Sequence, residues 1–323
     1  MRRPGIWAGC VGLCFLFGST CAEAASASET LYEQYEKLNT PENLGKSFAG
    51  GKLYPFQEQQ IRILGDLEKR PTIESARVIA QVVDEYLKRI EALGAQKFRQ
   101  SPLQALQLAM VSLCEKHAGS NIVFAWLEAL ARSPLTKEYA RGRALGAVAA
   151  RRLREVKPED DADGKKRGQL LLDLFLGDLS MSRLFHAPAR LRQFAEHADT
   201  VLPGDPVAFR NATVFVATTP PKRYAADFAF ASAIAEKQIK RKQPLSRDEK
   251  RDLLAVCNEW LKTYRPLAAK ENYATDLLGS QMLVLGGYAG NEDLAALLVE
   301  NGLKPIPYVE KPDRPVRPRP PRR

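Results

Sequence analysis

Residues Thr72 to Leu93 read TIESARVIAQVVDEYLKRIEAL, and this stretch decides the fold class. Apolar residues recur along it every three or four positions, the spacing that places side chains on one face of an α-helix. Pro71 directly precedes the stretch and marks its start. The sequence therefore predicts a long amphipathic helix. Its buried face is predicted to hold Val78, Ile79, Val82, Val83, Tyr86, Leu87 and Ile90.

The same helical spacing runs through nearly every other segment, and strand-like alternation is close to absent. A capping residue followed by proline marks helix starts at Ser101-Pro102 and Asp205-Pro206. A segment with some strand character, Ala212 to Thr219, follows the second start and is therefore expected to be helical. These signals predict an all-α chain.

Further signals mark helix ends. Ser246 and Glu249 form a capping-box pattern, which predicts a helix from Lys250 to Tyr264 that ends at Pro266. Gly302 follows a later helix and is expected to adopt the left-handed conformation that terminates many helices.

The predicted helices are expected to form antiparallel pairs. One helix–turn–helix unit spans Leu103 to Arg132 with a turn at Gly119, and another spans Tyr273 to Asn301 with a turn at Gly290. Stacks of such pairs are the units of α-solenoids. Because the period is irregular, the sequence predicts stacked antiparallel helix pairs that are either α-solenoid-like or part of an irregular helical domain.

Residues Gly286 to Gly302 read GGYAGNEDLAALLVENG. A pair of small residues, a glycine turn and a helix ending in Leu-Leu-x-x-x-Gly resemble the second half of an ankyrin repeat. HEAT-type repeats are similar in a looser way. The Thr-Pro-Leu-His opening of an ankyrin repeat is missing upstream, so the resemblance covers this stretch alone. It implies that protein partners bind on a concave helical surface.

The first residues resemble an export signal. Arg2-Arg3 precede an apolar run from Ile6 to Phe17, and Ala22-Glu23-Ala24 is a small-x-small cleavage pattern. Residues 1–24 are therefore predicted to be a cleaved signal peptide, which places the mature chain in the periplasm or outside the cell. Lipid attachment at Cys21 is the alternative, although the residues before it fit a lipoprotein signal poorly.

Two helical halves joined by a charged linker are expected. The N-terminal half is predicted over residues 25–157, and the C-terminal half over residues 169–303. Between them, residues 158–168 combine a proline, several acidic residues and Lys-Lys-Arg, a composition typical of a solvated loop. Residues 304–323 form a proline- and arginine-rich tail that is predicted to be disordered.

The tail carries much of the positive charge. The chain has a formal net charge of +10, and residues 304–323 contribute seven basic residues against two acidic ones. Proline alternating with arginine favours an extended cationic segment that contacts an anionic polymer or a membrane surface. Specific nucleic-acid binding is not predicted. The partner-binding residues are expected to be Arg314, Arg317, Arg319, Arg322 and Arg323.

Two cysteines, Cys114 and Cys257, remain after the signal peptide, and both lie on apolar helical faces. Buried free thiols are the expected state, and a disulfide between them is the alternative. Cys114 has metal-ligand spacing to His117, but nothing nearby supplies the further ligands of a structural zinc site. His117, His186 and His197 are therefore expected at the surface.

Other candidate chemistry is incomplete. Glu159 to Gly164 resembles the start of a calcium loop, but Leu170 occupies the position of the closing glutamate. Gly279-Ser280 lies in a predicted helix and lacks the strand–helix elbow of a nucleophilic serine. No metal site, cofactor or catalytic residue is predicted.

These observations favour an exported, non-enzymatic interaction or scaffold protein of the cell envelope. Its helical body would bind a protein partner, and its tail would contact an anionic one. An all-α hydrolase that acts on an envelope or extracellular polymer is the alternative, and storage of a small apolar ligand is a third hypothesis. A deep acidic cleft would favour the hydrolase, an open groove the binding protein, and an enclosed cavity the storage of a ligand.

Overall fold

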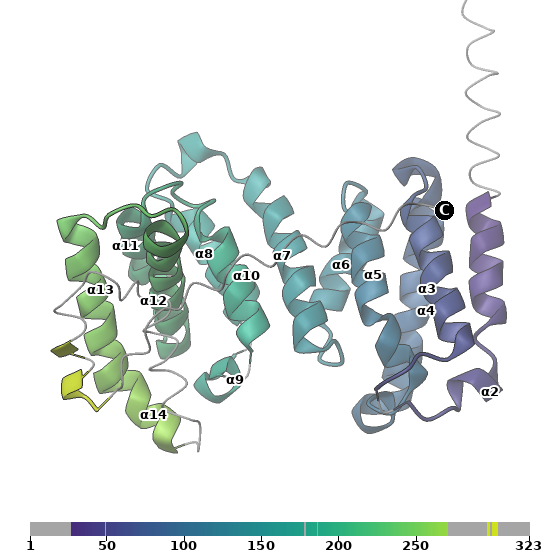
Figure 1. The fold of residues 1–323 in the computed structure, drawn as a ribbon. Helices are drawn as coiled ribbons and strands as arrows, with labels where there is room; N and C mark the ends of the chain where they lie inside the picture. The colour runs from purple at the N-terminus through teal and green to yellow at the C-terminus, as the bar shows by residue number, and fades with distance from the viewer. Residues whose placement is uncertain are drawn as a thin grey trace, which may run out of the picture. The chain divides into compact units, whose positions relative to one another are not determined.

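The computed structural model describes residues 27–270, apart from residues 49, 178 and 186, together with residues 296–297 and 299–302. All regular secondary structure in this part of the chain is helical, and no strand occurs in it (Figure 1). The predicted all-α fold class is therefore confirmed. Among the described helices, none combines the length and the apolar character that crossing a membrane requires. The expected signal peptide, the arginine-rich tail and most of the unit from Tyr273 to Asn301 lie outside the described residues.

The chain divides into two compact units. The first comprises the residues up to Asp160 together with Ala187–His197. The second comprises Asp161–His186 and the residues from Ala198 onward. The chain thus leaves the first unit, enters the second, and returns to the first for one helix.

The segment predicted to be a solvated linker, residues 158–168, contains more structure than expected. Pro158–Asp160 form a 3-10 helix, η2, and the next α-helix already begins at Lys165. Asp161 and Arg167 are buried. The boundary between the two units falls within this segment. The predicted bounds of the two helical halves, residues 25–157 and 169–303, stay predictions.

The helices of the first unit are α2 (Pro41–Leu44), α3 (Pro55–Glu68), α4 (Thr72–Phe98), η1 (Pro102–Leu106), α5 (Gln107–Lys116), α6 (Asn121–Arg132), α7 (Glu138–Glu155) and α10 (Pro188–Ala198). From α3 to α7, the helices of the first unit pack on the helix after next. α3 packs against α5, and α5 packs against α7. α4 packs against α6, which also packs against α7 (Figure 1).

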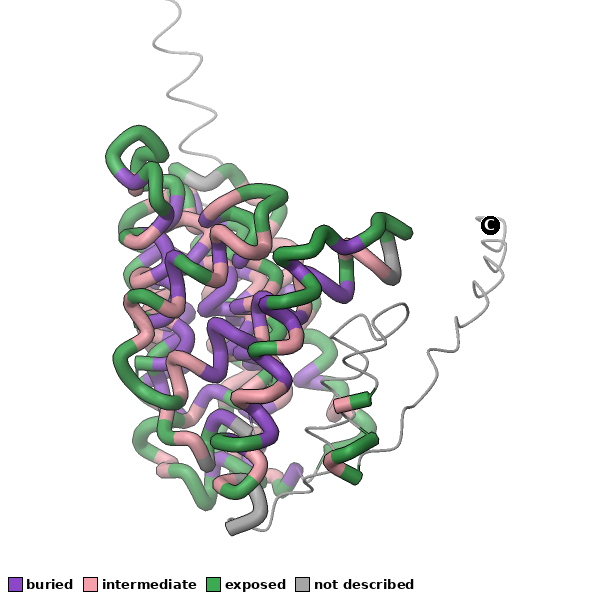
Figure 2. Tube along the Cα trace, turned by 90° about the vertical axis from the view of Figure 1, so that its left-hand side faces the viewer, coloured by how far each residue is buried: buried purple, intermediate pink, exposed green. Residues whose placement is uncertain are grey.

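The predicted amphipathic helix is α4. All seven residues predicted for its buried face, from Val78 to Ile90, are buried. Buried and exposed stretches recur along the described helices in Figure 2, as one-sided burial requires. The helix runs past its predicted end at Leu93 through a kink at Gly94, where φ is 68° and ψ is 167°. Glycine adopts this positive φ at little cost because it has no Cβ.

The predicted helix–turn–helix unit from Leu103 to Arg132 is also confirmed, as η1 and α5 followed by α6. The hydroxyl oxygen of Ser101 accepts a hydrogen bond from the backbone N–H of Leu103 at 3.2 Å, as the cap before Pro102 predicts. The first turn is a 3-10 helix rather than an α-helix.

The second unit consists of α8 (Lys165–Leu176), α9 (Met181–Phe185), α11 (Pro206–Val216), α12 (Pro220–Ala235), η3 (Glu236–Lys240), α13 (Arg247–Glu259), η4 (Trp260–Tyr264) and α14 (Arg265–Lys270). α11 packs against α8, α12 and α13. The caps predicted at Asp205 and at Ser246 with Glu249 are both formed. Most of the segment with strand character lies in α11, so the expectation of a helix there is confirmed.

Pro266 does not end a helix, contrary to the sequence-based expectation. α13 continues through η4, a π-helical turn, into α14, and Pro266 is the second residue of α14. A proline conflicts with the i→i−4 hydrogen bonds of an α-helix, and the wider π turn directly before it does not use that pattern.

Two glycines bring α7 and α10 close together. A Cβ added to Gly142 would lie 3.1 Å from the carbonyl carbon and oxygen of Ala189. One added to Gly146 would meet the side chain of Gln193. The two helices are further joined by Arg190 of α10, whose Nε lies 3.0 Å from a carboxylate oxygen of Glu138 of α7.

We expect Gly142→Ala to lower the free energy of unfolding by about 1–3 kcal/mol, because the backbone of Ala189 would have to shift to make room for the added methyl group. Urea denaturation followed by circular dichroism would measure the change. Gly65 of α3 is the matched control, since an added Cβ there has no atom within 4 Å. Gly65→Ala should stabilise the protein by up to about 1 kcal/mol through helix propensity. Equal effects at the two positions would contradict the close contact of α7 with α10.

Asp161 and Arg167 form a buried ion pair at the start of α8. Nε of Arg167 lies 3.0 Å from Oδ2 of Asp161. The backbone N–H groups of Lys166 and Arg167 donate to the same carboxylate at 2.9 Å. The guanidinium also donates to the backbone carbonyls of Asp161 and Thr200. The carboxylate therefore satisfies the free N–H groups of the helix start and neutralises the arginine.

Burial opposes the charged form of Asp161, but the hydrogen bonds from Arg167 and Lys166 outweigh it, and the pKa of the carboxyl is lowered. A lowered carboxyl pKa stabilises the fold above the ordinary value, and this contribution is lost as the pH falls through the lowered pKa. We expect Asp161→Asn to reduce the free energy of unfolding at pH 7 by about 3 kcal/mol.

The difference in the free energy of unfolding between Asp161→Asn and the wild type should become smaller as the pH falls below about 4, the ordinary pKa of aspartate. Urea denaturation at a series of pH values would show this. Asp248→Asn, which removes a carboxylate whose side chain is 64% exposed and which lies on α13, is the control and should change the stability little. If this difference for Asp161→Asn stayed constant with pH, the carboxylate of Asp161 would not be stabilised by the ion pair.

Candidate functional site

The cysteine–histidine pair with metal-ligand spacing serves the packing of the first unit. His117 is 1% exposed, so the expectation of a surface position is wrong for this residue. Its Nε2 donates to the backbone carbonyl of Glu68 at 3.2 Å, which ties the end of α5 to the end of α3. Burial lowers the pKa of His117. His197 is partly buried, and His186 lies outside the described residues.

Both described cysteines are buried free thiols, as expected. Burial raises the pKa of Cys257 to about 12 and also raises that of Cys114, so both are protonated at neutral pH. In the calcium-like segment, the carboxylate of Asp161 accepts the hydrogen bonds that start α8. Within the described residues, no group of three or more His, Cys, Asp and Glu side chains is arranged to hold a metal ion.

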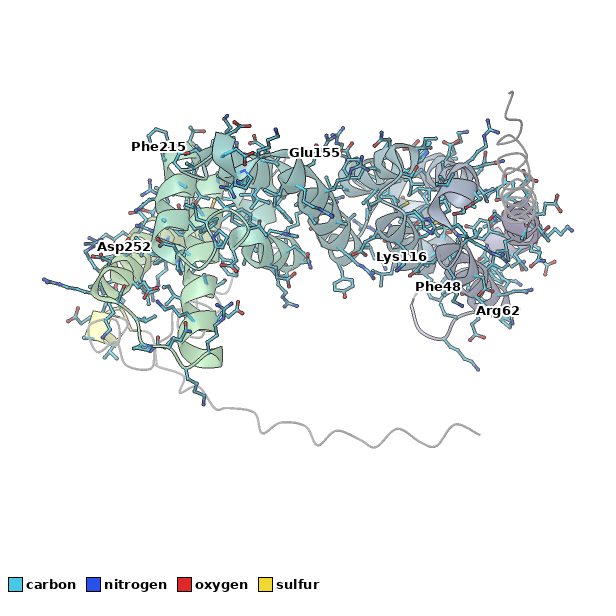
Figure 3. The ribbon with its side chains drawn as sticks, turned by 90° about the horizontal axis from the view of Figure 1, so that it is seen from above. Phe48, Arg62, Lys116, Glu155, Phe215 and Asp252 are labelled. Carbon is cyan, nitrogen blue, oxygen red and sulfur yellow. The ribbon has the colours of Figure 1, made fainter. Side chains whose placement is uncertain are left out.

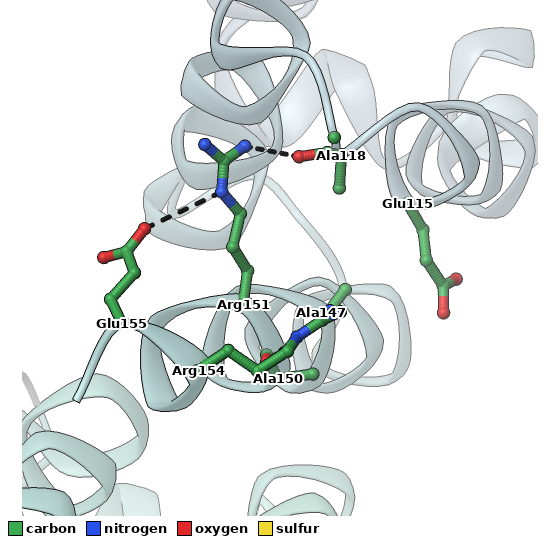
Figure 4. Close-up of a pocket in the computed structure, with 8 residues that line it drawn as sticks. Glu115, Ala118, Ala147, Ala150, Arg151, Arg154 and Glu155 are labelled. Carbon is green, nitrogen blue, oxygen red and sulfur yellow. Dashed lines mark hydrogen bonds and ion pairs between the residues drawn. The ribbon is translucent and has the colours of Figure 1, made fainter. Parts of the chain in front are cut away.

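A pocket of about 500 Å³ lies in the first unit, between the turn after α5 and the C-terminal half of α7 (Figure 4). Half of its lining residues are alanine or glycine, and the other half are charged. They are Glu115, Ala118, Gly119, Ala147, Ala150, Arg151, Arg154 and Glu155. The lining contains no serine, threonine, cysteine, histidine or lysine, so its two glutamates are the residues there that could act as a nucleophile or a base.

Arg151 fixes the shape of this pocket. Its guanidinium donates to the backbone carbonyl of Ala118 and to the side-chain oxygen of Asn121. Its Nε lies 3.8 Å from Glu155, as Figure 4 shows, and its guanidinium carbon lies 4.0 Å from the ring centre of Phe124. Arg151 therefore ties α7 to the turn and to the start of α6, and each of its three guanidinium nitrogens already has a partner.

Arg154 retains donors for a ligand. The two glutamates of the pocket already pair with Arg143 and Arg152, at 2.8 and 3.1 Å. Arg154 is exposed and donates from Nε to the backbone carbonyl of Ala150 at 2.9 Å. Its two terminal amino groups have no partner among the described residues. A guanidinium in this state can bind a carboxylate or a phosphate through two parallel hydrogen bonds.

The second unit contains a buried carboxylate, Asp227 of α12. Its Oδ1 lies 3.3 Å from Nε of Arg210 of α11, and Arg210 also lies 3.8 Å from Asp252 of α13. Oδ2 of Asp227 is buried and has no hydrogen-bond partner among the described residues. Burial raises the pKa of Asp227 to about 6, although Arg210 and Arg223 act to lower it.

Aromatic side chains pack beside this carboxylate. Tyr224 stacks on Trp260 with ring centres 4.9 Å apart, and Tyr264 meets Tyr224 edge-on at 5.0 Å. Burial and the nearby charge of Asp227 raise the pKa of Tyr264. Asp227 itself is fully buried, with 0% of its surface exposed.

The arginines expected to bind a partner, Arg314, Arg317, Arg319, Arg322 and Arg323, lie outside the described residues. The sequence reasoning missed Arg154 and Asp227. The available signal was a charged residue within an alanine-rich helix, in AVAARRLRE of α7 and AADFAFASAIA of α12. Apolar spacing alone does not tell whether such a residue faces a pocket, the interior or the solvent.

Comparison of the chain with protein-family models, with curated proteins and with solved structures finds no match. The pocket, the buried carboxylate and the distribution of charge are therefore the features of the chain that bear on its function.

We expect Asp227→Asn to change the pH dependence of stability. Because the pKa of Asp227 is raised to about 6, the folded state holds a proton that the unfolded state releases near pH 4. This proton stabilises the wild type at low pH, and the contribution is lost as the pH rises through about 6.

The free energy of unfolding of Asp227→Asn relative to the wild type should therefore rise by about 2 kcal/mol between pH 4 and pH 7. Urea denaturation across this range would measure it. Asp248→Asn, at a carboxylate whose side chain is 64% exposed, is the control and should give a flat difference. A flat difference for Asp227→Asn as well would show that its pKa is not raised.

Proposed function

We propose that this protein is an exported, non-enzymatic interaction or scaffold protein of the cell envelope. Residues 1–24 act as its signal peptide, its helical body binds a protein partner, and residues 304–323 contact an anionic polymer or membrane surface. The observation that carries the proposal is the pocket on α7, where Arg154 keeps free donors beside a lining of alanine and glycine.

The order of helix contacts in the first unit supports an α-solenoid-like arrangement. α3, α5 and α7 pack in sequence in one row, and α4 and α6 pack beside each other in a second row. Stacked helix pairs of this kind expose long helical surfaces, which repeat proteins use to bind other proteins.

The chemistry of the pocket favours a partner that inserts an acidic side chain. Ala147 and Ala150 are only partly buried, so another chain can approach α7 closely along them. Arg154 can then form a bidentate pair with a carboxylate, and arginine is enriched among the residues that dominate binding energy at protein interfaces. The pocket carries both arginines and glutamates, unlike the deep acidic cleft expected of the hydrolase.

An all-α hydrolase is the second candidate, and Asp227 is the observation that favours it. A carboxyl group with a pKa near 6 can act as a general acid close to neutral pH. A substrate would reach Asp227 only if the packing of α11, α12 and α13 opened, because the residue has 0% of its surface exposed.

The test uses the mature chain from Ala25 as bait in envelope extract at high salt. We expect a protein partner to be retained, and we expect Ala150→Trp and Arg154→Glu each to reduce its recovery by about tenfold or more. The first change fills the pocket, and the second reverses the charge that binds the carboxylate. Recovery would be measured by quantitative mass spectrometry.

Arg62→Glu is the matched control, since Arg62 is an exposed arginine on α3 that lies outside the pocket (Figure 3). It should leave the recovery of the partner unchanged. Equal recovery with all variants would show that the partner binds elsewhere on the body. If no protein were retained at high salt, the scaffold function would be contradicted, and the hydrolase with Asp227 as its general acid would be the remaining candidate.

A further inference from the structure

α12 and η3 are joined to α13 by a turn of the chain (Figure 1). The residues in and around this turn are rich in positive charge. Residues 236–251 read EKQIKRKQPLSRDEKR. Five cationic residues here are exposed, and we call this set the basic turn. Its members are Arg241, Lys242, Arg247, Lys250 and Arg251.

The acidic residues of the same segment contribute less surface charge. Glu249 has a side chain that is 5% exposed and is paired with Lys237 at 2.6 Å. Asp252 is 10% exposed at its side chain and lies 3.0 Å from Arg251. Glu236 and Asp248 are the exposed acids of the segment, so the basic turn retains an excess of positive surface charge.

Two members of the basic turn are not used by the fold. Arg247 and Lys250 are exposed and make no hydrogen bond or ion pair with the described residues. They lie three positions apart on α13, and Arg251 follows Lys250, so all three project from neighbouring positions on the first turns of the helix. Lys242 has a positive φ of 54°, which places a sharp turn of the chain between η3 and α13.

We propose that the basic turn binds the phosphate groups of an anionic lipid bilayer surface. Its cations are exposed on a turn and on the first turns of a helix. Arg241 and Arg251 also pair with Glu236 and Asp248, at 3.4 and 2.8 Å, whereas Arg247 and Lys250 keep their charge for a ligand. Arginine binds phosphate oxygens in pairs, and each basic residue held near an anionic bilayer strengthens attachment severalfold. This site goes beyond the proposed function, because it lies in the second unit and requires no protein partner.

The composition of the segment favours a bilayer over a nucleic acid as the binding partner. Residues 236–251 contain no aromatic side chain on which a base could stack. Leu245 is buried, so the described side chains of the turn offer charge rather than an apolar group for insertion. Attachment is therefore electrostatic and peripheral, and it weakens as the salt concentration rises.

The experiment measures flotation of the full mature chain with vesicles of phosphatidylglycerol and phosphatidylcholine, and with vesicles of phosphatidylcholine alone. We expect binding to the anionic vesicles at low salt and loss of binding at high salt. The triple variant Arg241→Gln, Arg247→Gln, Lys250→Gln should bind at least about tenfold more weakly.

The matched control is Arg62→Gln, Lys97→Gln, Lys116→Gln, which removes the same charge from exposed positions of the first unit (Figure 3 labels Arg62 and Lys116). It should bind within about twofold of the wild type, and both triple variants should keep the wild-type unfolding midpoint. If both triple variants lost vesicle binding equally, the net charge of the chain would explain the binding, and the proposal would be overturned.

Full binding by the basic-turn variant would assign attachment to other residues and would also overturn the proposal. So would binding to a soluble acidic polysaccharide together with no binding to vesicles, because the partner would then be a polymer. Residues 304–323, whose contact with an anionic surface belongs to the proposed function, are unchanged in both triple variants, so they cannot cause a loss that is confined to the basic-turn variant. Each outcome is also independent of whether the pocket on α7 retains a protein, so a failure here is distinguishable from a failure of the proposed function.

Discussion

Each described unit depends on guanidinium groups that reach from one helix to an acceptor on another. Arg190 of α10 reaches Glu138 of α7 at 3.0 Å, and Arg210 of α11 reaches Asp227 of α12 at 3.3 Å. An arginine does not lose its charge in a protein, so burying it is costly unless acceptors stand at the right positions. Apolar burial drives the helices together, and these pairs restrict how neighbouring helices can be placed along one another.

Helix faces and helix starts could be predicted because all the groups that determine them lie within a few residues. The buried face of α4 follows from spacing alone, and the cap at Ser246 needs only Glu249 three positions on. Pro266 shows the limit of such local signals. The proline is compatible with a continuous helix because the chain forms a π turn before it. No local pattern in the sequence predicts that turn.

The features of the candidate sites could not be predicted in the same way, because distant segments create them. His117 is buried by its contact with Glu68, which lies 49 positions earlier in the chain. The raised pKa of Asp227 requires burial among three helices, and spacing within α12 does not reveal which neighbours bury it. Arg151 and Arg154 look alike in the sequence, yet the first is held by the turn after α5 and the second is not.

That contrast separates two uses of positive charge in this basic chain. Arg151, Arg167 and Arg210 have acceptors on other segments, so folding itself constrains where they lie. Arg154 and Lys250 are exposed and form no ion pair within the described residues. Exposed cations of this kind add little to stability. Their positions are therefore free to serve recognition. A carboxylate at the pocket and a phosphate surface at the basic turn are the complementary chemistries, and both match the charge that the fold leaves unpaired.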